Sequence, residues 1–158
     1  CLAIASMKYR KFGKLDFKKF HPSGNIGSRL SQVDDLMIKE NKAPFIRENI
    51  LMDNALKTMN KFNLGVLIVR NKNKKTLGII SDGDIKRISQ KSTNIKNLIA
   101  KDIMKKKPIS VNQYMLAAEA LSVMNSKKVT CLCVHNAKNK NKTIGILTIH
   151  NILNANIR

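Results

Sequence analysis

The pattern of apolar and polar positions along the chain predicts one structural unit twice. In the first unit, apolar residues recur at helical spacing over 51–62, which predicts an amphipathic helix. The apolar run 64–69 is short and rich in β-branched residues, as expected of a buried strand. Polar residues 71–75 predict a hairpin turn. The strand after this turn ends at Ser81, and a second amphipathic helix starts near Asp82.

The second unit repeats this order of elements. Its first helix is predicted over 115–124, its buried strand over 129–134 and its hairpin turn over 136–142. Its last strand ends at Thr148, and an amphipathic helix follows from near Ile149. Because order, spacing and residue type all recur, we infer an internal repeat.

Each unit also opens with a strand, predicted close to Pro44 in the first and to Pro108 in the second. The order is therefore strand, helix, strand, strand, helix, and the fold class is α/β. One unit of roughly 55 residues buries too little apolar surface to be stable alone. This favours two units packed sheet to sheet as a pair.

The repeats set the predicted domain boundaries. The first unit covers 33–91, a linker covers 92–101 and the second unit covers 102–158. The first 32 residues belong to neither unit, and their early apolar residues are typical of the end of a helix that stops at Gly13. We therefore expect residues 1–32 to be the last part of a further, upstream domain.

The net charge of +20 demands a partner or a solvated surface. The lysines are scattered, tryptophan is absent and aromatic residues make up only 4%, whereas nucleic-acid binders concentrate their charge and add stacking aromatics. A solvated basic surface is the favoured interpretation, and nucleic acid is not an expected partner. No run of about 18 apolar residues occurs, so no membrane span is expected.

The cysteines indicate a reducing compartment. The chain has three, Cys1, Cys131 and Cys133, and the last two alternate on one predicted strand, where they would make a poor disulfide. We therefore expect a cytoplasmic protein. With His135 they share a strand face, which raises the alternative of a zinc site. Neighbouring strand residues converge poorly on one ion and no fourth ligand is visible, so we expect core cysteines and neither metal nor other cofactor.

Ser81 and Asp84 form the strongest candidate for a binding site. Ser81 ends a strand where a helix begins, so its hydroxyl and the first free N–H groups of the helix can hold a phosphate. Asp84 can accept hydrogen bonds from ribose hydroxyls. The structural alternative is that Ser81 caps the helix and Asp84 stabilises its positive end, and both roles are compatible.

The second unit offers a weaker version of this site. Thr148 keeps the hydroxyl, but Asn151 stands where the first unit has its aspartate. Asparagine is neutral and a poorer acceptor for ribose, so this site is either degenerate or differently selective. His150 replaces Gly83, and a surface histidine is its simplest interpretation, with ligand binding as the alternative.

The repeats resemble CBS motifs. They share an opening Asp-Ile/Leu-Met, at 35–37 and 102–104, and a closing Gly-Ile-x-Ser/Thr-x-x-Asp-Ile/Leu, at 78–85 and 145–152, where Asn151 departs from the pattern. The resemblance covers about 33–158 and occurs twice in register. It implies a tandem CBS pair, in which Ser81, Asp84 and their counterparts bind nucleotides.

The first 30 residues resemble the end of the sugar-isomerase (SIS) domain of arabinose-5-phosphate isomerases. The segment 21–27 reads His-Pro-Ser-Gly-Asn-Ile-Gly, against a family pattern His-Pro-Gly-Gly-x-Leu-Gly, so Ser23 and Ile26 depart from it. The family interconverts ribulose 5-phosphate and arabinose 5-phosphate in the pathway to the lipopolysaccharide sugar Kdo. The resemblance implies that His21 is the active-site histidine, which acts in proton transfer. The rest of that site lies upstream, so we expect no isomerase activity from this chain alone.

The combined expectation is a regulatory, ligand-sensing CBS pair attached to its own SIS domain. Its ligand is expected to be a nucleotide or nucleotide-sugar of the AMP, ATP or CMP-Kdo type, and the chain is expected to form a homo-oligomer. The alternatives are a purely structural oligomerisation module without a ligand, and nucleic-acid binding through the basic surface.

Overall fold

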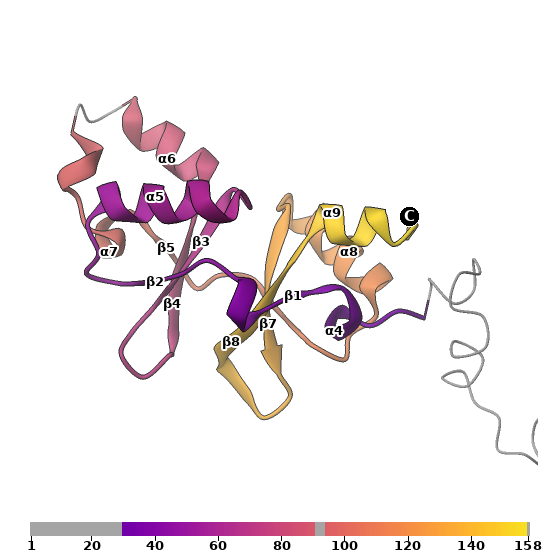
Figure 1. Cartoon of the computed structure of the whole chain (residues 1–158). Helices are drawn as coiled ribbons and strands as arrows, with labels where there is room; N and C mark the ends of the chain where they lie inside the picture. The colour runs from indigo at the N-terminus through magenta and orange to yellow at the C-terminus, as the bar shows by residue number, and fades with distance from the viewer. Residues whose placement is uncertain (1–29, 91–93, 158) are drawn as a thin grey trace, which may run out of the picture.

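A computed structural model describes residues 30–90 and 94–157. The predicted SIS segment 1–32, with His21 and Cys1, lies outside the described residues except for its last three positions. Two halves lie side by side, each a small sheet with helices on one side and a hairpin on the other (Figure 1). In chain order the elements are α4 (Val33–Leu36), β1 (Ile38–Lys39), η1 (Glu40–Lys42), β2 (Phe45–Arg47), α5 (Met52–Phe62), β3 (Val66–Arg70), β4 (Thr76–Ser81), α6 (Asp82–Ser89), η2 (Ile95–Asn97), α7 (Ala100–Ile103), β5 (Lys105–Lys106), β6 (Ser110–Asn112), α8 (Ala117–Lys127), β7 (Cys131–Asn136), β8 (Asn139–Thr148) and α9 (Ile149–Asn154).

The α/β prediction, with strand, helix, strand, strand, helix in each unit, is confirmed by this order. One local prediction was wrong: the turn expected over 136–142 is much shorter, because β8 begins at Asn139. The side-chain oxygen of Asn136 accepts hydrogen bonds from the backbone N–H groups of Lys138 and Asn139, at 3.1 and 2.7 Å. This Asx-type turn closes the hairpin tightly, so the polar residues after it continue the strand.

The two units exchange their opening segments. The sheets have the orders β2-β3-β4-β5 and β1-β8-β7-β6, so β1 pairs with the second unit and β5 with the first. The short helices α4 and α7 are exchanged together with β1 and β5. The N–H of Val33 bonds to the carbonyl of Met115, and the N–H of Ala100 bonds to the carbonyl of Ile50, both at 2.9 Å. Each sheet is therefore completed by residues from the other repeat.

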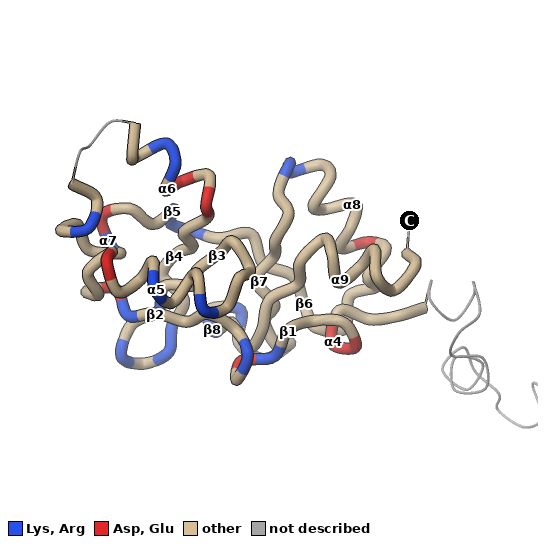
Figure 2. The backbone as a smooth tube through the Cα atoms, turned by 45° about the horizontal axis from the view of Figure 1, so that its top comes forward, with Lys and Arg blue, Asp and Glu red and all other residues tan. Residues whose placement is uncertain are grey.

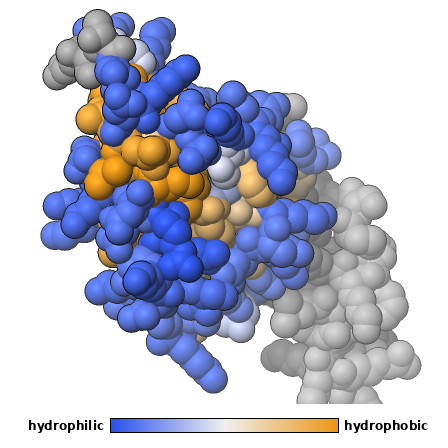
Figure 3. All heavy atoms as spheres, turned by 60° about the vertical axis from the view of Figure 1, so that its left-hand side comes forward, coloured by the Kyte–Doolittle hydropathy of each residue, from blue (hydrophilic) through white to orange (hydrophobic). Residues whose placement is uncertain are grey.

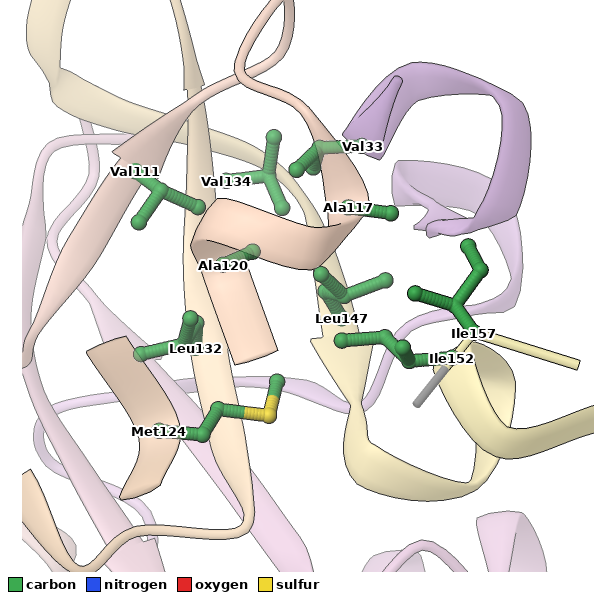
Figure 4. Packing of buried hydrophobic residues seen from close by; sticks show 10 residues of the cluster. All are labelled: Val33, Val111, Ala117, Ala120, Met124, Leu132, Val134, Leu147, Ile152 and Ile157. Atoms are coloured by element: carbon green, nitrogen blue, oxygen red, sulfur yellow. The ribbon is translucent and has the colours of Figure 1, made fainter. Parts of the chain in front are cut away.

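The exchange is built into the hydrophobic cores. Val33 packs in the core of the second half, and Ala100 packs in the core of the first half. Figure 4 shows Val33 among side chains from α8, β7 and β8. Buried apolar surface is the main stabilising term, so separating the units would expose part of both cores.

A third core joins the two sheets, as the sheet-to-sheet prediction requires. It contains Val66 and Ile68 from β3, Cys133 from β7 and Ile146 from β8. Near the hairpin end, the Thr76 hydroxyl donates a hydrogen bond to the hydroxyl of Thr143 at 2.7 Å. The halves therefore form one packed body, whose shared seam fixes the ends of both sheets relative to each other.

Two glycines let the exchanged strands approach. A Cβ at Gly78 would lie 2.6 Å from the carbonyl oxygen of Lys105 and 2.8 Å from the sulfur of Met104. A Cβ at Gly145 would meet the carbonyl oxygen of Ile38 at 2.6 Å and the sulfur of Met37 at 2.9 Å. The methionine of each opening motif therefore packs over the glycine of the other repeat's closing motif. This contact explains why one motif has a methionine and the other a glycine at these positions.

Lys and Arg positions are frequent in the first half and on the hairpin of the second, whereas α4 and α9 carry none (Figure 2). On the side of the first half, a continuous apolar area is surrounded by hydrophilic residues (Figure 3). Leu51, which directly precedes α5, is an exposed large apolar residue of this half. Over the described ranges, no helix is both long and apolar enough to cross a membrane.

Candidate functional site

A cleft of about 1030 Å³ lies between the two units. It receives Ser81 and Asp84 from the first unit, and Thr148, His150 and Asn151 from the second. The structure thus brings all five described candidate residues to one cavity. They meet because β4 and β8 end at the same edge of the paired sheets and each leads directly into a helix, α6 or α9.

Ser81 and Asp84 form a reciprocal capping box at the start of α6. The Ser81 backbone N–H donates to Oδ2 of Asp84 at 3.0 Å, and the Ser81 hydroxyl donates to the same oxygen at 2.5 Å. The backbone N–H of Asp84 donates back to the Ser81 hydroxyl at 3.3 Å. The structural alternative for this pair is therefore present in the fold, and it holds the carboxylate in a fixed orientation.

The other oxygen of Asp84 contacts two cations. Arg87, one turn further along α6, forms an ion pair with Oδ1. Lys105, from the exchanged strand β5, places its Nζ atom 2.8 Å from the same oxygen. Only 6% of the Asp84 side chain is exposed, whereas 61% of Arg87 and 59% of Lys105 are. Burial alone would raise the pKa of Asp84, but hydrogen bonds from Lys105 and Ser81 outweigh it and lower the pKa to about 2.

The second unit repeats the box without the charges. The Thr148 hydroxyl donates to Oδ1 of Asn151 at 2.6 Å, and the Thr148 backbone N–H donates to the same oxygen at 3.0 Å. The strand exchange places Ile38 where the first unit has Lys105. His150 is exposed and lines the cleft at the position of Gly83.

The walls of the cleft carry an excess of positive charge. Its cationic lining residues are Arg87, Lys105, Lys106, Lys107 and Lys128, against the carboxylates of Asp82 and Asp84. Lys106, Lys107 and Lys128 are exposed, and no ion pair to any of them is found within the described residues. Low-dielectric walls strengthen such a field, so the cleft favours an anionic ligand.

The first turn of α6 is open to this cleft. The N–H of Gly83 lacks an intrahelical acceptor, as all first-turn N–H groups do. A Cβ at Gly83 would meet only the hydroxyl oxygen of Ser81, at 3.8 Å. The cleft therefore combines the N–H of Gly83 and several cations with a fixed carboxylate.

Lys105 and Arg87 were not among the residues predicted for the site. Arg87 could have been found, because it lies one helical turn after Asp84 on the predicted helix. Lys105 lies in the other repeat, and only the exchange of β5 brings it to Asp84.

Cys131 and Cys133, on one face of β7, lie in the core between the two sheets. Cys133 is buried against Val66, Ile68 and Ile146, so it is part of the core. Burial raises the pKa of Cys131 to about 12 and that of Cys133 to about 11, so both remain thiols. Over residues 30–90 and 94–157, no group of three His, Cys, Asp or Glu side chains is arranged to hold a metal ion.

Comparison with known proteins identifies the repeat. The family model for the CBS domain matches residues 33–91 and again 100–158. Among curated proteins, the chain is 31% identical over 157 residues to the arabinose 5-phosphate isomerase KdsD of Escherichia coli K12, a match that covers 99% of this chain and 47% of that protein. It is 32% identical over 148 residues to the uncharacterized protein RP505 of Rickettsia prowazekii, covering 94% of this chain and 45% of that protein. The chain thus spans about half the length of these relatives.

Solved structures share the fold. The crystal structure of CBSX2 in complex with AMP superposes with a TM-score of 0.68 at 23% identity, covering 79% of this chain and 95% of that chain; CBSX2 comes from Arabidopsis thaliana. The CBS domain of a bacterial CNNM/CorC family Mg²⁺ transporter in complex with ATP also gives a TM-score of 0.68, at 14% identity, with 90% and 94% covered. At these identities the similarity establishes the architecture.

Proposed function

The chain belongs to the CBS-domain family, as a tandem pair of CBS domains, and from this premise we propose that its cleft binds a nucleotide or nucleotide-sugar in order to regulate an attached enzyme. The observation that supports it most is the cleft between the units, where the fixed carboxylate of Asp84, the start of α6 at Gly83 and several exposed lysines line one cavity. Two proteins with this architecture were solved with AMP and with ATP.

In this proposal the phosphate lies at the start of α6, close to Ser81 and Gly83, and the ribose hydroxyls face Asp84. The N–H groups of Asp82 and Asp84 already have acceptors, the carbonyl of Gly65 and the hydroxyl of Ser81, so the N–H of Gly83 and the helix dipole favour an anion at this point. The carboxylate of Asp84 is ionised at every physiological pH, so it can accept hydroxyl hydrogen bonds throughout. Thr148, His150 and Asn151 form the opposite wall of the cleft.

The attached enzyme is proposed to be an arabinose-5-phosphate isomerase, because nearly the whole chain aligns with about half of KdsD. His21, in the SIS segment, would then act only in the intact enzyme, and this chain alone would be inactive. CMP-Kdo, a product of the pathway, suits a feedback role because it combines a nucleotide with an acid. A ligand that prefers one arrangement of the CBS pair would shift the population of the attached catalytic domains.

The expected cytoplasmic location and homo-oligomeric state stay predictions. The apolar area of the first half is a candidate face for self-association (Figure 3). A purely structural oligomerisation module remains the main competing function. It differs from the proposed function in needing no ligand, and it leaves the positive lining of the cleft unexplained.

Blocking the first turn of α6 tests the proposal. Gly83→Leu places a bulky side chain in the open space of the cleft, so we expect nucleotide affinity to fall roughly tenfold or more. Folding should not suffer, because leucine is a better helix former than glycine. Isothermal titration with AMP, ATP, CMP and CMP-Kdo provides the affinities, and thermal unfolding provides the stability.

The matched control is Ser89→Leu, which adds the same side chain to an exposed position at the other end of α6, outside the cleft lining. It should bind as the parent does. If Gly83→Leu binds nucleotide as tightly as Ser89→Leu, the ligand does not lie at the start of α6. If the parent binds none of the four compounds, the structural module is the better account.

A further inference from the structure

The two ends of the cleft differ in charge. The first end has charged side chains at and around the capping residue of its helix, and the second has neutral side chains at the equivalent positions. We define the first half-site as Asp84, Arg87 and Lys105 with Ser81, and the second half-site as the equivalent residues of the other repeat. By sequence register and strand pairing, Asp84, Arg87 and Lys105 correspond to Asn151, Asn154 and Ile38 respectively. All three charged side chains are thus replaced by neutral ones.

These replacements form a set. Asp84 is buried, and a buried carboxylate is stable in its charged form only when cations or hydrogen-bond donors compensate it. Lys105 and Arg87 supply that compensation. The second half-site has Ile38 in place of the lysine, so an aspartate there would lack this cation. The amide of Asn151 keeps the capping bonds to Thr148 without a charge to compensate.

The first half-site is suited to exchange partners with a ligand. The charged ends of Arg87 and Lys105 lie on an exposed side of the cluster, and both residues line the cleft. A ribose can donate its hydroxyl protons to Asp84 while one of the cations turns to the phosphate. Asp84 then keeps the other cation as its partner, and the cation that has turned pairs with the phosphate. An uncharged nucleoside offers no partner to that cation.

We propose that each chain binds one nucleotide, at the first half-site, and that the set Asp84, Arg87 and Lys105 is what selects it there. The second half-site, with Asn151, Asn154 and Ile38, forms a wall of the cleft and holds no nucleotide of its own. This inference rests on the proposed function and adds stoichiometry, position and a requirement for a ligand phosphate.

The unmodified chain should show this in isothermal titration. AMP is expected to bind with a stoichiometry of one per chain, and adenosine about 30-fold or more weaker, since a lost charge-assisted hydrogen bond accounts for a factor of this size. Two equal sites per chain, or adenosine binding as tightly as AMP, would overturn the inference while leaving nucleotide binding itself intact. Absence of all nucleotide binding would instead refute the proposed function.

Exchanging the two sets tests the selection directly. The variant Asp84→Asn/Arg87→Asn/Lys105→Ile copies the second half-site into the first and should fold, because the second half-site already folds with these residues. Its affinity for AMP should fall about 100-fold or more. The reciprocal variant Ile38→Lys/Asn151→Asp/Asn154→Arg installs the charged set in the second half-site and should raise the stoichiometry to two.

A matched control separates the effect of these three residues from the effect of the protein's overall positive charge. Lys140→Asn makes the same change in net charge as the first exchange, on the β7–β8 hairpin and outside the cleft lining. It should bind AMP within about twofold of the parent. If the control and the exchange variant weaken AMP equally, the charged set does not select the ligand. Should the reciprocal variant not fold, the first exchange and the AMP-to-adenosine ratio decide the matter.

Discussion

Replacing Gly78 with alanine should destabilise the protein by about 1–3 kcal/mol. The added methyl group would lie 2.6 Å from the carbonyl oxygen of Lys105, a backbone atom of the exchanged strand β5. To make room, β5 must move away from β4, which weakens the pairing of Gly78 with Lys106 and of Ile79 with Lys105. Urea unfolding followed by circular dichroism measures the change, and Gly145→Ala should give a loss of similar size in the other sheet.

Gly83→Ala is the matched control for this prediction. A Cβ at Gly83 meets only the hydroxyl oxygen of Ser81, at 3.8 Å, so alanine fits there and improves the helix propensity of α6. Its stability should equal or slightly exceed that of the parent. A Gly78→Ala variant as stable as Gly83→Ala would contradict the close packing of the exchanged strands.

Acid should remove about 2 kcal/mol of stability through Asp84. The pKa of its carboxyl group is lowered from 3.8 to about 2 in the folded protein, with burial opposing and hydrogen bonds from Lys105 and Ser81 favouring the charged form. Because the folded pKa is the lower one, this stabilisation is present above pH 4 and is lost as the pH falls from about 4 to 2. Urea unfolding at steps across this range measures it.

Asp84→Asn is the proper reference, since the Thr148–Asn151 pair shows that asparagine keeps the capping box. The pKa values of Glu40 and Asp53 are also lowered, by hydrogen bonds from Arg70 and Lys57 respectively, so both proteins should lose stability in acid. The parent should lose more, by the amount attributed to Asp84. Parallel pH profiles for the two proteins would show that Asp84 contributes no pH-dependent stability.

Much of the fold was accessible from the sequence because the repeat is strong. The starts of α6 and α9, at Asp82 and Ile149, fall where the hydroxyl residues Ser81 and Thr148 end a strand. The short strands β1 and β5 were missed. Each has only two residues, and β5 consists of two lysines, so neither shows the alternation of apolar and polar residues from which a strand is predicted.

The site was predicted in part for the same reason. Ser81 and Asp84 could be paired because their spacing is a local helix-start pattern. The ion pair of Asp84 with Lys105 joins residues from different repeats, and it depends on the exchange of β5. Local patterns contain no information about such a contact. The sequence therefore predicted the role of Asp84 at the helix start and as an acceptor, but not its ion pairs with Arg87 and Lys105.

The central claim is that a nucleotide binds in the cleft at the start of α6. The most direct measurement is a titration of the isotope-labelled chain with AMP, followed by the backbone amide resonances in NMR. We expect saturable shifts that are largest at Ser81 and Gly83, which line the cleft, with small changes at the hairpin residues Lys138 and Lys140. Shifts confined to those hairpin lysines, or no saturable shift at any concentration up to the millimolar range, would contradict it.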